Sequence, residues 1–400
     1  MMVMYLLTPL GIMLTAVLLR GKMSRNRQMV PLIALAAGMI AYCVVPKNII
    51  DISRYWMQLE RIRGLPISDA FTWTSDGLLL KNLVFWLVAQ TGDNHILPFL
   101  TMGTIYGVSA YIVIDAQEKG QYDTLKILLT VICLLPFYNV FSNVRNVTSF
   151  ALILLAVYRD LWQRKRNIAT VLLYVLPCFF HMTGFVVVLF RLAVILVQRF
   201  PRMGTLLTLG IPTAAVAVYE RVGRIELPGA FGAILSRAIW KAYSYTVGTS
   251  EYSTLTQTHG SFIASRIVAM IYCTGLMLCL YSALRHRQDS DVGRYRYKVF
   301  LSLVTMLTII WAAIGVVKFW VFFYLVCIAS IPFAAELTRN RRQLRRWQIY
   351  GALMLQLAAV MEVVLQVRTI YTYLDHGAFA NSMITTNYVT VIIHAILGVS

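Results

Sequence analysis

Long runs of apolar residues recur along the whole chain. They are roughly 14–22 residues long, which is typical of helices that cross a membrane. Charged residues make up only 13% of the chain, about half the share that soluble proteins carry. The sequence therefore predicts an all-α fold, a polytopic transmembrane helical bundle of about 12–13 spans.

The positive charges indicate the orientation of the bundle. Lys and Arg number 36 against 17 Asp and Glu, and the strongest basic clusters lie in short segments between apolar runs. Such segments stay on the cytoplasmic side of a membrane. They occupy residues 20–28, 159–167, 285–298 and 339–347. Because this rule explains most of the net charge, no nucleic-acid partner is indicated.

The orientation of these loops predicts the rest of the topology as one integral membrane domain, 1–400. Two long external loops cover about 47–94 and 220–261. Residues 78–92 are predicted to form an amphipathic helix on, or re-entering, the outer face, because a span there would invert every later loop. Residues 387–399 are predicted either to cross the membrane or to enter it only partly. The other spans are predicted at about 3–19, 29–46, 95–114, 124–138, 147–158, 168–181, 183–198, 205–219, 262–283, 299–317, 319–337 and 348–367.

The sequence contains no pattern that indicates a cofactor or a metal. All six cysteines fall inside apolar runs without metal-ligand spacing, so they are predicted to be small apolar side chains rather than ligands or disulfide partners. No phosphate-binding glycine loop, zinc motif or nucleophile elbow is present. The predicted cofactor set is empty.

Several basic residues fall at the predicted outer boundary of the membrane, where the charge rule does not explain them. The segment FSNVRNVTSF (141–150) is predicted to be an outward-facing turn that carries Arg145. A single cation at a helix end often only extends to the interface, which remains an alternative for Lys318. Together these residues predict an anion-binding cavity on the outer face: Arg54, Arg145, His181, Arg237, Arg266 and Lys318.

One further arginine and one acid complete the candidate residues. Arg191 lies within a span and is predicted to face protein or a polar cavity, but it is left out of the candidate site. Asp51 precedes Arg54 by three residues, so the two would share a helix face and pair. The alternative role for Asp51 is a general base or a sugar-hydroxyl ligand, with Glu220, Glu226 and Glu251 competing for it. Tyr55 and Tyr138 belong either to an interfacial aromatic belt or to a surface that stacks on sugars.

Four short motifs, in order, resemble the EpsG-like branch of the Wzy-type bacterial polysaccharide polymerases. An acid and a tyrosine follow the second span, here Asp51 and Tyr55. An outer-face arginine, Arg145, opens a span that leads to a basic cytoplasmic loop. A phenylalanine–histidine pair ends a later span at His181. Near the end, Lys318 precedes the phenylalanine-rich segment FWVFFY.

The resemblance implies a glycosyltransferase similar to metal-independent lipid-linked glycosyltransferases (GT-C-like). Such an enzyme joins undecaprenyl-diphosphate-linked repeat units into a surface polysaccharide (O-antigen, capsule or exopolysaccharide) on the outer face of the cytoplasmic membrane. Arg145, His181, Lys318 and Arg54 would hold the leaving diphosphate, and Asp51 would act as acid–base or acceptor-orienting group. The implied partners are the lipid-linked donor and acceptor and membrane lipid, with a chain-length regulator and a flippase as candidate partners.

Other functions remain as alternatives. A flippase or transporter for lipid-linked oligosaccharide would also need a cationic cavity, but one that continues through mid-membrane positions. A lipid-linked glycan ligase would use the same chemistry with a different acceptor. An acyltransferase is less favoured, because no histidine and acid are poised on the cytoplasmic side.

Overall fold

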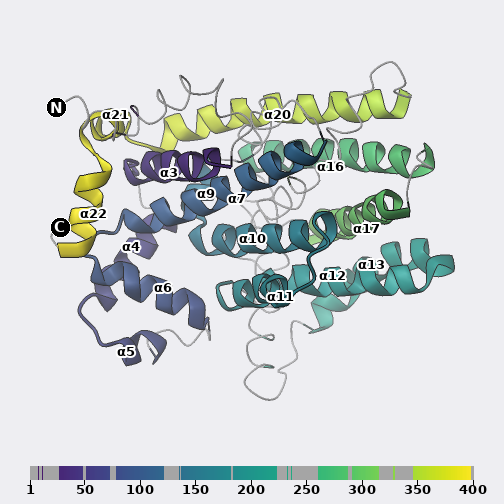
Figure 1. Cartoon of the computed structure of the whole chain (residues 1–400), viewed down its shortest axis with the longest axis horizontal. Coiled ribbons are helices and arrows are strands. Elements are labelled where there is room, and N and C mark those ends of the chain that lie inside the picture. The colour runs from purple at the N-terminus through teal and green to yellow at the C-terminus, as the bar shows by residue number, and fades with distance from the viewer. Residues whose placement is uncertain are drawn as a thin grey trace. The chain divides into compact units, whose positions relative to one another are not determined.

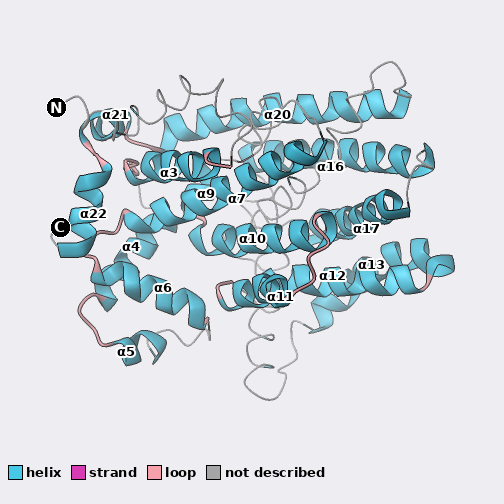
Figure 2. Cartoon of the chain, viewed as in Figure 1, coloured by secondary structure: helices cyan, strands magenta, loops and turns pink. Residues whose placement is uncertain are grey.

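The computed structural model describes most of the chain as helix. The described residues are 27–47, 51–72, 78–120, 137–181, 183–222, 260–286, 291–314 and 346–397, with isolated positions at Thr8, Gly11, Leu135, Gly232, Ser236 and Ile328. Figure 2 shows helices joined by short loops over these residues, and no strand among them. The all-α prediction is confirmed for this part of the chain.

The helices belong to two compact units, each of which is described by itself. The first unit comprises Met1–Leu155, Val175–His181 and Gln366–Ser400. It contains α3 (Met29–Tyr42), α4 (Asp51–Ile62), α5 (Ile67–Thr72), α6 (Leu79–Gln90), α7 (Ile96–Gly120), α9 (Phe137–Ser142), most of α10 (Val144–Val157), the 3₁₀ helix η2 (Leu176–Phe179), the end of α20 (Arg346–Tyr373), α21 (His376–Thr385) and α22 (Tyr388–Leu397).

The second unit comprises Ala156–Tyr174 and Met182–Leu365. It contains the π-helix η1 (Tyr158–Trp162), α11 (Ile168–Val175) up to Tyr174, α12 (Thr183–Arg199), the 3₁₀ helix η3 (Pro201–Met203), α13 (Gly204–Val222), α16 (Gly260–His286), α17 (Asp291–Ile314) and most of α20. Within it, α17 packs against α12, α13 and α16. The prediction of one integral membrane domain stays a prediction.

Three helices of the described chain are long and apolar enough to cross a membrane. They are Ile96–Ala116 in α7, Ile263–Ser282 in α16 and Arg346–Tyr373 in α20. Shorter apolar helices lie at Met29–Tyr42, Leu79–Gln90, Ile168–Phe179, Gly204–Ala215 and Lys298–Ile310. Each of these coincides with an apolar run from which the sequence predicts a span or a membrane-surface helix, whereas the total of about 12–13 spans stays a prediction.

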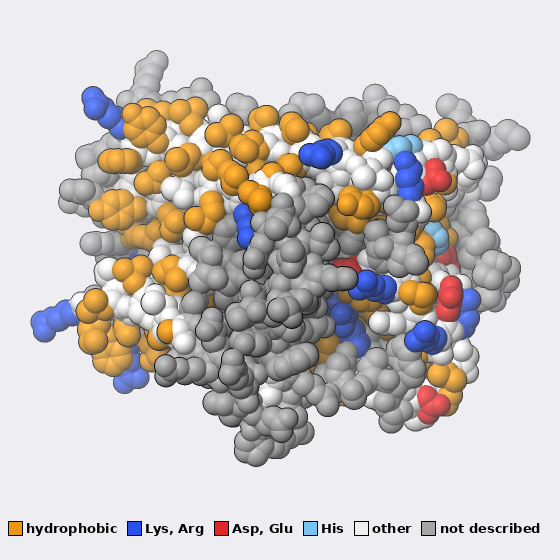
Figure 3. Space-filling view, turned by 180° about the vertical axis from the view of Figure 1, so that it is seen from behind, with side chains coloured by type: hydrophobic (Ala, Val, Ile, Leu, Met, Phe, Trp, Pro, Cys, Tyr) orange, Lys and Arg blue, Asp and Glu red, His pale blue; other side chains and the backbone are white. Residues whose placement is uncertain are grey.

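The described surface carries large apolar side chains at many positions (Figure 3). On α20 the exposed residues recur every three or four positions, so they form one continuous stripe. This stripe contains Leu353, Leu357, Val360, Val364 and Val367, each more than half exposed. A soluble monomer rarely exposes so large an apolar patch, whereas lipid covers it without cost.

Small residues let pairs of helices approach closely. In the first unit α3 and α7 lie side by side (Figure 1), and Gly103 and Gly107 of α7 both face Ala34 of α3. A Cβ added at Gly107 would come within 2.9 Å of the Ala34 Cβ. The spacing Gly103-x-x-x-Gly107 is the small-residue motif by which membrane helices pack without a hydrophobic driving force.

A second close approach joins α16 and α20 through Gly275 and Gly351, and it gives a first prediction. A Cβ at Gly351 would lie 2.7 Å from the Gly275 carbonyl oxygen and 2.6 Å from Cys279 Sγ. Gly351→Ala should therefore force the helices apart and cost about 1–3 kcal/mol, as overpacking usually does. Thermal unfolding of the purified protein in detergent measures the loss.

Gly210 of α13 provides the matched control for Gly351. It is also a glycine inside an apolar helix, but a Cβ there would meet nothing within 4 Å. Gly210→Ala should leave the unfolding midpoint unchanged or raise it slightly, because alanine is the better helix former. Equal midpoints for the two variants would mean that the α16–α20 contact is loose.

The region predicted as an external loop at 47–94 is instead largely helical. It contains α4, α5 and α6, and α6 packs against both of the others. The predicted helix at 78–92 is present as α6, whose 12 residues span about 18 Å, well short of the roughly 30 Å of a bilayer core. However, Lys81 and Asn82 of α6 are buried against protein rather than exposed on a polar face, so the amphipathic pattern expected for a surface helix is wrong.

Other predicted boundaries differ from the structure at their ends. The helix α17 begins at Asp291, inside the segment predicted as a cytoplasmic loop, and α20 continues to Tyr373. The C-terminal helix α22 has 10 residues, about 15 Å, and is too short to span by itself. The predicted spans at 3–19, 124–138 and 319–337 and most of the loop at 220–261 lie outside the described residues, apart from isolated positions.

Candidate functional site

Helix α4 presents the first three candidate residues on one face. Asp51, Arg54 and Tyr55 stand at positions i, i+3 and i+4 of the helix, where side chains are neighbours. The Arg54 guanidinium lies 3.7 Å from the Asp51 carboxylate, so the predicted pairing is confirmed. Arg54 is 69% exposed in its side chain, and such an exposed pair contributes little to stability. Both charges are therefore accessible to a ligand.

Arg145 is held against α4 by Tyr55. Its Nε donates a hydrogen bond of 3.2 Å to the Tyr55 hydroxyl, and its guanidinium lies 5.3 Å from the centre of the Tyr55 ring. Tyr55 is buried, and its ring packs edge-to-face on Phe85 of α6 at 5.7 Å. Residues from two helices, Tyr55 of α4 and Phe85 of α6, thus fix the direction of one guanidinium.

The segment FSNVRNVTSF is not the turn that the sequence predicts. It is helical on both sides of Asn143, since α9 ends at Ser142 and α10 begins at Val144. Arg145 therefore stands in the first turn of α10. A cation is unfavourable near the N-terminus of a helix by about 0.3–1 kcal/mol, because the helix dipole is positive there. The position concentrates positive charge at one point, as an anion site requires.

His181 is tied to the helix face that carries Arg145. The Pro177 carbonyl in η2 accepts a hydrogen bond of 2.9 Å from the Ser149 hydroxyl and one of 3.0 Å from the His181 backbone N–H. Ser149 lies one turn beyond Arg145 on the same side of α10. The backbone of His181 is therefore bonded to the same carbonyl that binds α10. The side chain of His181 is half-buried.

Tyr138 lies in α9, which has six residues and is too short to cross a membrane. Its ring stacks on Tyr373 at 5.2 Å. Burial of the hydroxyl raises the pKa of Tyr138 to about 12, and nearby Tyr373 and the Asp51 carboxylate act in the same direction. The hydroxyl thus stays protonated at physiological pH and retains its donor. Helix α9 packs against α4, which carries Asp51.

The first unit thus brings together six of the nine candidate residues. They are Asp51, Arg54, Tyr55, Tyr138, Arg145 and His181. Arg266 lies in α16 of the second unit and is half-buried. Arg237 and Lys318 lie outside the described residues. In the part of the chain that the structure describes, no cluster of three or more His, Cys, Asp or Glu could hold a metal ion.

A comparison with protein families finds one family model that matches this chain. The family model described as the EpsG family covers residues 47–376, which is most of the chain and includes all nine candidate residues. The chain belongs to the EpsG family. This is a family similar to the Wzy-type polysaccharide polymerases, so the resemblance that the sequence indicates is confirmed.

The family and the apolar helices together make this EpsG-family chain an integral membrane protein with a polysaccharide polymerase-like, glycosyltransferase-like function. Neither a curated protein nor a solved structure matched the chain.

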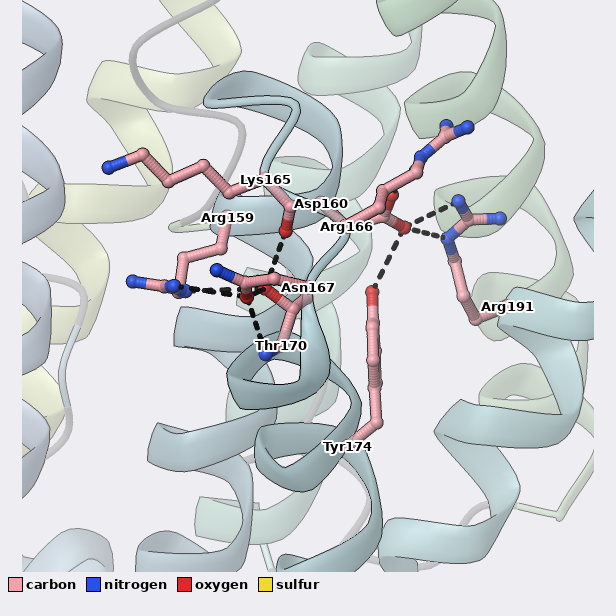
Figure 4. Close-up of polar contacts among 8 residues, drawn as sticks. All are labelled: Arg159, Asp160, Lys165, Arg166, Asn167, Thr170, Tyr174 and Arg191. Atoms are coloured by element: carbon pink, nitrogen blue, oxygen red, sulfur yellow. Dashed lines mark hydrogen bonds and ion pairs between the residues drawn. The ribbon is translucent and has the colours of Figure 1, made fainter.

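A cluster in the second unit contains charges that sequence reasoning did not connect (Figure 4). The Asp160 carboxylate accepts hydrogen bonds from Arg191 at 2.5 Å and 2.9 Å, from Arg166 at 2.9 Å and from the Tyr174 hydroxyl at 3.4 Å. Arg191 and Asp160 are both more than nine-tenths buried. The prediction that Arg191 faces protein is confirmed. The signal available in the sequence was that Asp160 is the one acid within RDLWQRKRN.

A second set of bonds fixes the loop that follows η1. Arg159 donates to the Thr170 hydroxyl at 3.3 Å and to Asn167 at 3.4 Å, and Thr170 donates to the Lys165 carbonyl at 2.5 Å. Figure 4 shows these side chains on one side of the loop and the Asp160 pair on the other. Part of this basic segment thus bonds to its own loop and the helix after it.

Proposed function

We propose that this protein joins undecaprenyl-diphosphate-linked oligosaccharide repeat units into a surface polysaccharide on the outer face of the cytoplasmic membrane. The observation that carries the proposal is the arginine fixed by Tyr55 beside the Asp51–Arg54 pair, inside the region that matches the family. Arginine suits a diphosphate, because its planar fork matches phosphate oxygens and stays charged when water is excluded.

In the proposed reaction a sugar hydroxyl of the acceptor unit attacks the anomeric carbon of the donor chain. The bond from that carbon to the diphosphate oxygen breaks, and undecaprenyl diphosphate leaves with the electron pair. Arg145, Arg54 and His181 stabilise the negative charge that develops on the leaving oxygens. Asp51 accepts the proton of the attacking hydroxyl or orients it. Tyr138, protonated and carried by a helix that packs against α4, donates a hydrogen bond to a sugar oxygen.

Purified protein reconstituted with labelled lipid-linked repeat units tests this function. The expected products are a ladder of longer glycans that remain lipid-linked and one free undecaprenyl diphosphate for each bond made. A flippase would instead move the units across the vesicle membrane and leave their length unchanged. A ligase would consume the units only when a different acceptor is supplied. Absence of both the ladder and the released diphosphate would refute the polymerase proposal.

The side of the membrane on which residues 47–94 lie is a separate prediction. Residues 47–94 should lie outside as a whole, since α6 is short for a span. Ser68→Cys and Asn94→Cys flank α6, and in a cysteine-free background both should react with an impermeant maleimide added to intact cells. Asn94 is partly buried and bonded to Arg63 and Glu60, so its cysteine should react more slowly. Reaction of Asn94→Cys only after the cytoplasmic side is opened would make α6 a span.

A further inference from the structure

The last turn of helix α20 carries exposed side chains that have no role in the site described so far. Tyr371 is 72% exposed, and the Lys47 Nζ lies 5.9 Å from the centre of its ring. Arg368 precedes Tyr371 by three positions in the helix, so their side chains are neighbours. The ring of His376 stacks on Tyr371 at 5.1 Å. We call these four residues, all of them exposed, the α20 cluster.

Backbone pairing holds Lys47 beside the end of α20. The segment that follows α3 and the segment that follows α20 run antiparallel and form a bridge between Pro46 and Leu374. The backbone N–H of Lys47 donates a hydrogen bond of 3.0 Å to the carbonyl of Tyr373. The α20 cluster therefore combines residues from two distant parts of the sequence at a fixed place in the first unit.

The same end of α20 also reaches the candidate site. The ring of Tyr373 stacks on Tyr138 at 5.2 Å. Tyr138 lies in α9, which packs against α4, the helix that carries Asp51 and Arg54. The last turn of α20 thus contributes Tyr373 to the candidate site and Tyr371 to the α20 cluster.

The two cations of the α20 cluster are not explained by the charge rule that orients the chain. In the predicted topology Lys47 and Arg368 lie at the outer boundary of the membrane, whereas the rule accounts for cations on the cytoplasmic side. Neither cation forms an ion pair with a residue that the structure describes. The nearby Asp375 carboxylate accepts hydrogen bonds from the backbone N–H groups of Gly377 and Ala378 instead. The cluster is therefore suited to an anionic ligand.

We propose that the α20 cluster is a subsite for an acidic sugar of the lipid-linked glycan, bound outside the sugar that reacts. The proposal rests on the proposed function and names a class of substrate for it. A sugar ring has a face of C–H groups that packs on an aromatic ring, and a uronic acid also carries a carboxylate. Tyr371 presents an exposed ring, and Lys47 and Arg368 donate charge-assisted hydrogen bonds to the carboxylate. A neutral sugar would use the ring and leave both cations without a partner.

The test uses the repeat-unit oligosaccharide that mild acid releases from the lipid-linked units of the native cells. Neither lipid nor diphosphate then contributes to binding. In one portion the carboxyl groups are reduced to alcohols, which removes the charge and keeps the rings. The purified protein should bind the native oligosaccharide about tenfold more tightly than the reduced one, since two exposed charge contacts together contribute about that factor.

Variants assign this difference to the α20 cluster. The double variant Lys47→Gln with Arg368→Gln should bind the native oligosaccharide about tenfold more weakly than the wild-type protein and the reduced one equally well. Tyr371→Ala should weaken the binding of both. Because these side chains are exposed, the substitutions should leave the fold intact.

Arg346 and Trp347 provide the matched control. They are also an exposed arginine and an exposed aromatic residue of α20, but they lie at its other end. Arg346→Gln and Trp347→Ala should leave both affinities unchanged. A double variant of Lys47 and Arg368 that binds like the wild-type protein would mean that these cations contact lipid headgroups, and it would overturn the proposal.

Two further outcomes would also overturn the subsite. One is a repeat unit that contains no acidic sugar, and the other is a wild-type protein that binds both oligosaccharides equally or binds neither. If the wild-type protein still forms the polymer ladder in these cases, the proposed function stands and only the subsite is refuted. Absence of the ladder and of released diphosphate would refute the proposed function as well.

Discussion

Arg145→Ala should abolish polymer formation, and Arg145→Lys should lower its rate roughly ten- to a hundredfold. Arg145→Lys keeps the positive charge but loses the planar guanidinium with its parallel N–H donors. In the native protein Nε donates to Tyr55, and a guanidinium has further N–H donors in the same plane, whose geometry matches the oxygens of a phosphate. A lysine ammonium cannot bond Tyr55 and present two parallel donors in one plane. Lipid-linked single repeat units should accumulate in both variants.

The polymer ladder and the pool of lipid-linked units measure this effect, after correction for the amount of protein in the membrane. Arg63, an exposed arginine bonded to Asn94 in the same unit, serves as control, and Arg63→Ala and Arg63→Lys should give normal ladders. Tyr55→Phe removes the hydroxyl and keeps the ring, so its activity should lie between those of the native protein and Arg145→Lys. A normal ladder in Arg145→Lys would mean that Arg145 only contacts lipid headgroups.

Asp160→Asn should destabilise the second unit by about 3–5 kcal/mol, because it leaves Arg191 buried without its counter-charge. The comparison with Arg166 is direct, since Arg166 bonds the other oxygen of the same carboxylate at 2.9 Å but is 61% exposed in its side chain. Arg166→Met should cost at most about 1 kcal/mol, as for other exposed pairs. Comparison of the two variants therefore separates the effect of burial on stability from the effect of the distance between the charges.

Thermal unfolding in detergent and the amount of protein in the membrane measure these differences. The double variant Asp160→Asn with Arg191→Met removes both buried charges, and it should recover a large part of the stability that Asp160→Asn alone loses. Equal losses for Asp160→Asn and Arg166→Met would contradict the assignment of Arg191 and Asp160 as the pair that burial makes essential.

Most helix positions could be predicted from the sequence, because apolar runs bounded by charges identify a membrane helix without knowledge of its neighbours. The Asp51–Arg54 pair and the inward direction of Arg191 could be predicted for a similar local reason, since spacing and the cost of a charge in lipid decide them. The start of α10 at Val144 could not be predicted from the sequence, because an arginine in the first turn is unfavourable with respect to the helix dipole.

The contacts that organise the candidate site could not be predicted from the sequence, because they join residues that are far apart in it. Tyr55 and Arg145 are 90 positions apart in sequence, and no local pattern indicates that their side chains meet. Lys81 and Asn82 are a second example, because their polarity indicated a helix at a wet surface. Protein buries them instead. Tertiary packing, which the order of residue types in α6 does not encode, decides between these environments.

The bond between Tyr55 and Arg145 has a consequence for the free energy with which a substrate is bound. A free arginine samples many rotamers, and immobilising such a side chain on binding usually costs about 0.5–1.5 kcal/mol. Here the ring of Tyr55, itself fixed by Phe85, holds the guanidinium before any substrate is present. The ordering entropy is thus lost during folding, not at each encounter. We expect a site that is preorganised in this way to bind an anionic group without that ordering cost.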